Sequence, residues 1–157
     1  MRAVVLPASP IGSLRTLELG PAHETLLQSF FDANPEYFVT VNGEPAGPGE
    51  AREEIESELP AGWSFTKRWI IGYADGRGEL AAMASVVTDL LATGVWQIGL
   101  FIVATARHGN GEARILHQGL QGFRERQLQR LLQILLLGVR IKSTQQNAGI
   151  RRESTAQ

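Results

Sequence analysis

The chain has 157 residues, of which 43% are hydrophobic and 20% charged, and its formal net charge is −1. These values are typical of one folded domain, and a nearly neutral chain has no basic excess with which to bind nucleic acid or an anionic membrane. The absence of cysteine excludes disulfides, thiolate metal ligands and a cysteine nucleophile. The three histidines lie far apart in sequence, so we expect no metal site.

Residues 1–13 contain two prolines and a glycine, and we expect a loose leader. Their apolar patch, Ala3–Leu6, is shorter than the ~7–15-residue core of a signal peptide. No run of the chain approaches the ~18 apolar residues that a membrane-spanning helix needs. We therefore expect a cytoplasmic protein with no membrane partner.

The first regular elements are a strand and a helix. Leucine alternates with polar residues from Leu14 to Leu19, which predicts a half-buried strand. Pro21 is well placed to start a helix over Ala22–Ala33, which Asn34-Pro35 ends. The apolar face of this helix consists of Leu26, Leu27, Phe30 and Phe31.

The next segment, 36–43, carries aromatic and β-branched residues, and we assign it no element. A loop rich in glycine and proline follows. Residues 50–59 are predicted to form a short acidic helix whose charges face solvent.

Three strands are predicted in the middle of the chain, over 66–74, 79–91 and 95–104. The first two are joined by Asp75-Gly76-Arg77-Gly78, a sequence typical of a hairpin turn. The third follows a short turn at 92–94. Together they predict an antiparallel meander.

The meander runs into a turn with two glycines, Gly109 and Gly111, and then into a helix that starts at Glu112. The first amides of a helix have no internal partners and attract anions, and glycine lets a ligand approach the backbone closely. Arg107 and His108 stand at the edge of this turn. The unit predicts a site for a diphosphate-bearing cofactor.

Beyond Phe123 the pattern is ambiguous. Residues 131–139 are compatible with a buried strand or with more helix, because periodicity does not separate the two in a short apolar run. Residues 141–157 are polar and are expected to be a frayed tail.

Three kinds of glycine loop bind diphosphates. A Walker loop is excluded because neither glycine is followed directly by Lys-Ser or Lys-Thr, and the dinucleotide fingerprint is matched only in its first half. The third kind is the cofactor loop of the GNAT acetyltransferases, [Q/R]-x-x-G-x-[G/A], which the turn His108-Gly109-Asn110-Gly111-Glu112-Ala113 resembles. Histidine replaces Gln or Arg at the first position, which a loop working through main-chain amides tolerates.

The resemblance extends from Leu14 to about Gly122 and is closest to a bacterial subgroup of GNAT proteins, with similar segments at 34–38 and 41–45. It implies an α/β (α+β) fold with a mixed, largely antiparallel sheet flanked by helices, in the order β-α-α-β-β-β-α-β. It also implies a single domain over 14–140 and acetyl-CoA as cofactor. The backbone of Phe101, Ile102 and Val103 would pair with the pantetheine arm, and Arg107 with the turn 108–113 would hold the pyrophosphate.

The C-terminal part departs from the family. Leu137-Gly138-Val139 resembles the fifth strand, but Lys142 stands where the family has Asn, and no aromatic residue follows Phe123. The family's general-acid tyrosine is also missing downstream. We therefore expect an atypical or truncated C-terminus, with an uncovered apolar edge that favours homodimerisation.

The resemblance implies transfer of an acetyl group to a primary amine of an acceptor that the sequence does not name. Asp89 is a weak candidate for the base, Glu36 and Tyr37 for the acceptor pocket, and the side chain of Glu112 is expected to point outward. The alternatives are a weakly active or inactive domain that binds CoA as a sensor, and a module that only binds partners.

Overall fold

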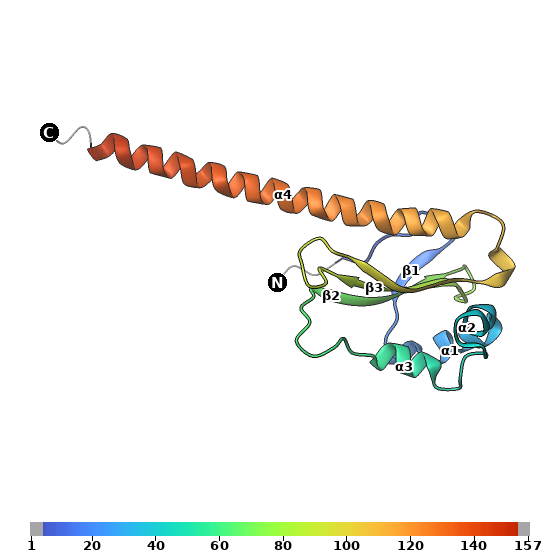
Figure 1. The fold of residues 1–157 in the computed structure, drawn as a ribbon. Helices are drawn as coiled ribbons and strands as arrows, with labels where there is room; N and C mark the ends of the chain where they lie inside the picture. The colour runs from blue at the N-terminus through green and yellow to red at the C-terminus, as the bar shows by residue number, and fades with distance from the viewer. Residues whose placement is uncertain (1–4, 154–157) are drawn as a thin grey trace. The chain divides into compact units, whose positions relative to one another are not determined.

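The structure is a computed structural model that describes residues 5–153. Its contacts divide the chain into two units, Met1–Gln121 and Gly122–Gln157, so that the boundary falls inside the last helix (Figure 1). The expected single domain over 14–140 stays a prediction.

The elements follow one another along the chain as β1 (Arg15–Glu18), the 3-10 turn η1 (Pro21–His23), α1 (Glu24–Ala33), α2 (Glu36–Asn42), α3 (Glu50–Glu56), β2 (Lys67–Ala74), β3 (Leu80–Thr88), β4 (Gln97–Val103), η2 (Thr105–Arg107) and α4 (Glu112–Glu153). The expected first strand and helix, the acidic helix and the three strands of the meander all form, with ends that shift by a few residues.

The four strands make one sheet in the order β1-β2-β3-β4, and every neighbouring pair is antiparallel. The predicted hairpin turn joins β2 and β3, where the carboxylate of Asp75 accepts the main-chain N–H groups of Arg77 and Glu79 at 2.9 and 3.0 Å. A sheet of this kind flanked by helices confirms the predicted α+β class.

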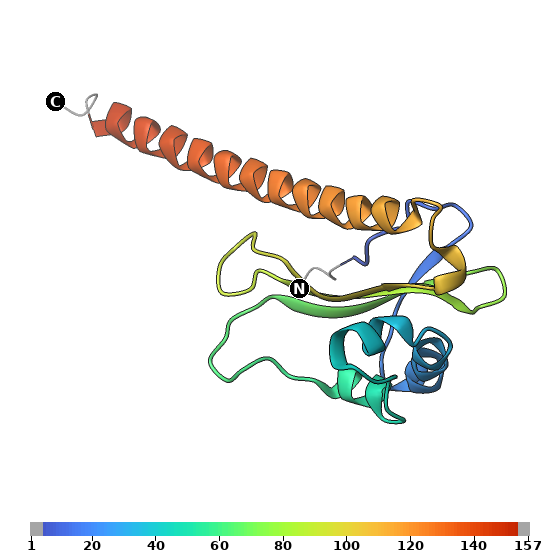
Figure 2. The ribbon, with the colours of Figure 1, turned by 45° about the vertical axis from the view of Figure 1, so that its right-hand side comes forward.

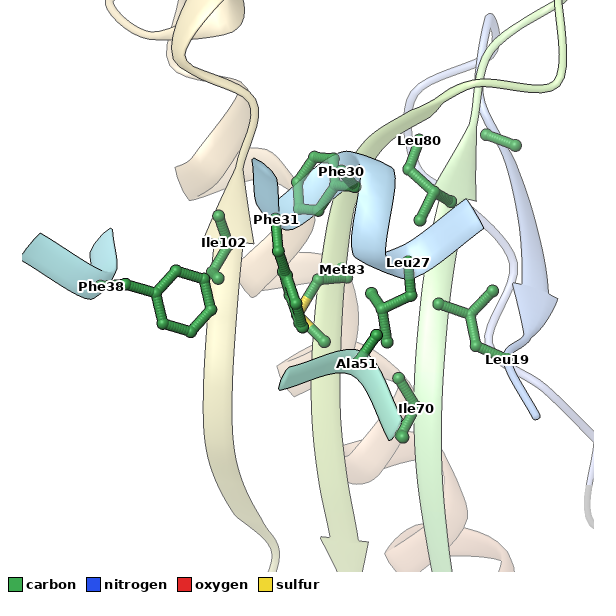
Figure 3. Close-up of a cluster of buried hydrophobic side chains, with 11 residues drawn as sticks. Leu19, Leu27, Phe30, Phe31, Phe38, Ala51, Ile70, Leu80, Met83 and Ile102 are labelled. Atoms are coloured by element: carbon green, nitrogen blue, oxygen red, sulfur yellow. The ribbon is translucent and has the colours of Figure 1, made fainter. Parts of the chain in front are cut away.

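One face of the sheet is covered by α1, α2 and α3 (Figure 2). The apolar face predicted for α1 supplies Leu27, Phe30 and Phe31, which are buried against Met83 of β3 and Ile102 of β4 (Figure 3). Burying these side chains contributes roughly 2 kcal/mol each. This core fixes the corner between α1 and α2 close to β4.

The other face carries cross-strand pairs that are also buried, among them Trp69 opposite Val86 and Tyr73 opposite Ala82. The first turns of α4, which belong to the same unit, bury Leu116 and Leu120. The chain before β1 forms no helix or strand over its described residues, yet Pro7 is fully buried.

The segment 36–43 forms the helix α2, an element absent from the predicted order. Pro35 occupies the N-cap with helical angles, and Gly43 ends the helix in the left-handed region at φ +82°. The ring of Phe38 packs edge-on against Phe31 at 4.9 Å. Packing and the two caps therefore override the strand propensity of the aromatic and β-branched residues.

The last predicted strand is the second correction. Residues 131–139 lie within α4, and so do residues 141–153 of the expected frayed tail, while 154–157 lie outside the described residues. The segment contains no proline and is rich in Leu, Gln and Arg, which all favour helix. In the described part of the chain, no helix is apolar over a stretch long enough to cross a bilayer.

Candidate functional site

The outer edge of β4 is the main-chain surface on which the site is built. Within the described residues β4 pairs only with β3, so one row of its N–H and C=O groups has no strand partner. Ser85 lies opposite Leu100 and Val86 lies opposite Ile98, which leaves Gly99 as an extra residue in a bulge. A bulge of this kind bends a strand and increases its local twist.

A cleft of about 400 Å³ lies beside this C-terminal half. Its walls come from the α1–α2 corner, from α2, from β4 and from the chain after β4. The lining residues are Asn34, Glu36, Tyr37, Thr40, Val41, Phe101, Ile102, Val103, Thr105 and His108. Six of the predicted site residues, three of β4 together with Glu36, Tyr37 and His108, therefore meet in one cavity.

Asn34 holds the two sides of the cleft together. Its side chain is buried and donates to the carbonyl of Phe30 at 2.8 Å, and its amide oxygen accepts the N–H of Thr105 at 2.8 Å. These bonds join the end of α1 to the chain that follows β4. The sequence indicated Asn34 only as the end of a helix, because its partner lies 71 positions away.

Glu36 is also hydrogen-bonded to Thr105. The hydroxyl of Thr105 donates to its carboxylate at 2.7 Å. This bond is the main reason why the pKa of Glu36 lies below its ordinary value; the main-chain N–H of Glu36 and the charge of His108 also lower it, while a slight desolvation of this exposed side chain opposes them. Glu36 is therefore ionised at neutral pH.

The glycine turn lies directly after these residues. Gly109 and Gly111 have φ angles of +85° and +74°, and a Cβ on either would meet no atom within 4 Å. The backbone there needs glycine, and the space beside it is open. The Nε2 of His108 donates to the carbonyl of Val103 at 2.8 Å, so it carries the proton and ties the turn to the end of β4.

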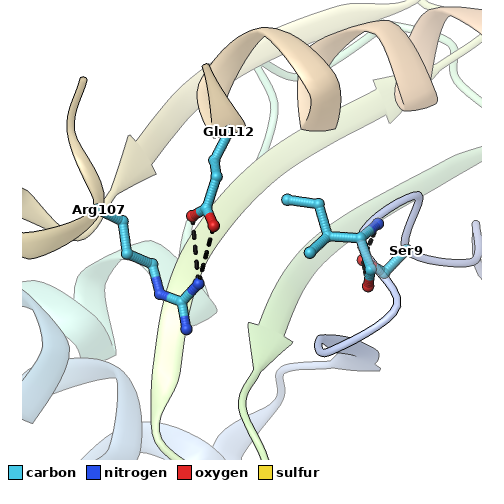
Figure 4. A network of polar contacts seen from close by, with 4 residues as sticks. Ser9, Arg107 and Glu112 are labelled. Atoms are coloured by element: carbon cyan, nitrogen blue, oxygen red, sulfur yellow. Dashed lines mark hydrogen bonds and ion pairs between the residues drawn. The ribbon is translucent and has the colours of Figure 1, made fainter. Parts of the chain in front are cut away.

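Arg107 and Glu112 form an ion pair across the turn (Figure 4). One guanidinium nitrogen of Arg107 lies 3.1 and 3.2 Å from the two carboxylate oxygens. The side chain of Glu112 is only 19% exposed, so the expectation that it points outward is wrong. The attraction of Arg107, together with that of the helix N-terminus, folds it back.

Asp89 lies elsewhere. It follows the end of β3 at φ +53°, and its carboxylate accepts the N–H of Gly94 at 2.7 Å, which stabilises the loop before β4. The cleft lies at the far end of β4, and six residues of strand span about 20 Å. Asp89 is not brought to the other predicted residues.

Four lining residues were not singled out by the sequence: Asn34, Thr40, Val41 and Thr105. The sequence does contain a signal for the helix that carries Thr40 and Val41. Pro35 stands directly before this helix and Gly43 directly after it, as is common at helix ends. The described residues hold no group of three or more side chains with which a metal ion could be bound.

Among comparisons with known proteins, only the comparison with solved structures identifies a similar fold. No family model and no curated protein matches the chain. Among solved structures, an acetyltransferase from Thermus thermophilus is similar with a TM-score of 0.55 and 17% identity, over 71% of this chain and 67% of that one. A GNAT family acetyltransferase from Brucella melitensis in complex with acetyl-CoA has 17% identity over 71% and 69% of the chains, but its TM-score of 0.45 is too low to support a conclusion. At this identity the likeness shows the fold alone: the chain is similar in fold to the acetyltransferase from Thermus thermophilus.

Proposed function

We propose that the protein is an N-acetyltransferase that transfers the acetyl group of acetyl-CoA to a primary amine. The observation that carries the proposal is the cleft beside the edge of β4, whose lining includes His108, the residue directly before the open glycine turn at the start of α4. A long, thin ligand with a charged end fits such a path.

The edge of β4 supports the pantetheine part of the proposal. The two amide groups of a pantetheine arm can pair with the main chain at 101–103 as an added strand would, because the row of groups there has no strand partner in the described chain. Phe101 is held from the other side by the ring of His117, at 6.3 Å between ring centres.

The turn supports the diphosphate part. Gly109 and Gly111 leave room for phosphate oxygens, and the first amides of α4 offer donors. Arg107 is the nearest fixed cation in sequence, but Glu112 already neutralises it. We propose that Arg107 exchanges Glu112 for a phosphate oxygen when the cofactor binds.

Acetyl-CoA supplies the activated acetyl group. The protein has to hold the acceptor amine against it, stabilise negative charge on the carbonyl oxygen with a main-chain N–H of β4, and exclude competing water. The attacking amine must be neutral, and its proton passes to solvent.

Calorimetric titration with acetyl-CoA and with CoA tests the cofactor. We expect saturable binding of both; no heat of binding at millimolar ligand would refute the proposal. Release of free CoA thiol in the presence of an amine panel, measured above the rate of hydrolysis alone, then tests the transfer.

A second candidate function has its own support. Residues 131–153 are helical rather than a fifth strand, so the described chain lacks one element that the resemblance implies. A domain that binds CoA without transferring an acetyl group would fit this difference. Binding of CoA with no amine-dependent thiol release would favour it.

A further inference from the structure

The charge of the cleft points to the class of acceptor. Among the ten residues that line it, Glu36 is the only one with a formal charge when histidine is neutral. The others offer amide and hydroxyl groups, an imidazole, a phenol ring and aliphatic side chains. One fixed negative charge in this cleft attracts a cationic acceptor, and it does not oppose the pantetheine arm proposed beside β4, because that arm is uncharged.

The position of that charge is fixed. Thr105 donates its hydroxyl to the Glu36 carboxylate at 2.7 Å, and Asn34 in turn holds the main chain of Thr105 at 2.8 Å. Glu36 also begins α2, which the packing of Phe38 anchors in the core. The hydrogen bond thus holds this exposed carboxylate at the end of β4.

The hydrogen bonds that hold Glu36 also lower its pKa, which makes it a weak proton acceptor. An ammonium group beside it keeps its proton. Such a nitrogen has no free electron pair with which to attack a thioester, so the nitrogen bound by Glu36 and the nitrogen that is acetylated have to be different atoms.

The cleft walls between the Glu36 carboxylate and β4 are apolar, so they suit a ligand with a short apolar chain between two polar groups. Val41, Phe101 and Ile102 line the cleft together with the half-buried Tyr37. Methylene groups would contact these side chains without leaving polar groups unpaired.

We propose that the acceptor is a diamine or polyamine, with one ammonium group bound by Glu36 and a second amine acetylated. This rests on the acetyltransferase function proposed above. In the transfer, the carbon–nitrogen bond forms and the carbon–sulfur bond breaks with its electron pair going to sulfur; the attacking nitrogen releases one proton to solvent, and the CoA thiolate takes up one proton from solvent to leave as the thiol.

The first test measures binding without turnover. Butane-1,4-diamine and butylamine, which differ in one terminal amine, are titrated into the protein saturated with CoA, followed by NMR or calorimetry. We expect the diamine to bind about three- to fivefold more tightly, the range of an exposed ion pair, with the advantage shrinking as salt is added. Equal affinities would overturn the proposal.

Two variants locate the effect. Glu36→Gln keeps the size and hydrogen-bonding capacity of the side chain and should abolish the advantage of the diamine. Glu44→Gln removes one negative charge from an exposed loop residue that does not line the cleft, and should preserve the advantage. A diamine advantage that survives in Glu36→Gln contradicts the assignment.

Turnover separates this proposal from the proposed function. Acetylation of both amines with the same KM, unchanged in Glu36→Gln, would refute the role of Glu36 and leave the acetyltransferase intact. A Glu36-dependent preference for the diamine without any acetylation would refute the enzyme and leave the cation site. We expect Glu36→Gln to raise the KM for the diamine about three- to fivefold with little change in kcat.

Discussion

Replacing Gly109 by alanine tests the glycine turn most directly. The backbone of Gly109 has φ +85°, and an added Cβ would meet nothing within 4 Å. Any loss of stability in Gly109→Ala therefore reflects backbone strain and not a clash. The chain offers a matched position in Gly78, which has φ +81° and equally open space in the hairpin between β2 and β3.

The expected magnitude follows from two opposing terms. A non-glycine residue in the left-handed region costs about 1–2 kcal/mol. Alanine also restricts the unfolded chain, which offsets about 0.4–1 kcal/mol of that cost. The net loss is about 1 kcal/mol, equivalent to a fall in Tm of about 3 °C for a domain of this size.

Thermal denaturation should show this loss in both Gly109→Ala and Gly78→Ala, and no comparable loss in Gly47→Ala, where φ is not positive and the space is open. Gly109→Asn should lose less than Gly109→Ala, because asparagine tolerates the left-handed region better. Binding of acetyl-CoA should weaken in Gly109→Ala but not in Gly78→Ala. If Gly109→Ala is as stable as Gly47→Ala, or if both strained variants bind the cofactor like the wild type, the reasoning about this turn is wrong.

Four further results are expected. Asn34→Ala leaves the N–H of Thr105 without its partner and should lower the free energy of unfolding by about 1–3 kcal/mol in urea denaturation. An unchanged midpoint of denaturation would contradict the role of Asn34 in joining α1 to the chain after β4. Glu112→Gln should tighten CoA binding in calorimetry, because it frees Arg107 for phosphate, and weaker binding would show that the ion pair orders the turn instead. Burial raises the pKa of Tyr73 to about 12, so its contribution to stability is complete below the ordinary pKa near 10 and lost as the pH rises toward 12. Ultraviolet absorbance of the folded protein follows the ionisation of the two tyrosines in the chain, and both of them titrating as in a free peptide would refute this. The helix α4 exposes four leucines, namely Leu131, Leu132, Leu135 and Leu136. Light scattering after size exclusion should therefore show dimers or larger species, and a monomer at all concentrations would count against this prediction.

Short sequence patterns were sufficient to predict the elements that depend mainly on neighbouring residues. The alternation at 14–19, the spacing of apolar residues in α1 and the Asp-Gly turn between β2 and β3 each predicted the element that forms. The glycines of the proposed phosphate-binding turn were also visible, because only glycine takes φ angles of +85° and +74° without strain. The order of these elements also follows directly from the sequence, because each pattern occupies its own stretch of the chain.

Two elements were decided by context that short patterns do not contain. The segment 36–42 has residues that favour a strand, but its caps and the burial of Phe38 against Phe31 make it a helix. Residues 131–139 had been compatible with both states, and they continue the helix that begins at Glu112.

The sequence by itself determined the meander, the glycine turn and the residue types available for binding a cofactor. Only the tertiary structure decided which of them share a cleft, because that depends on bonds between residues far apart in the chain. Asn34 and Glu36 reach Thr105 across 71 and 69 positions, while Asp89 is held by Gly94 at the opposite end of β4. Long-range pairing of this kind leaves no periodic trace in a sequence, and it is what places one fixed negative charge beside the free edge of a strand.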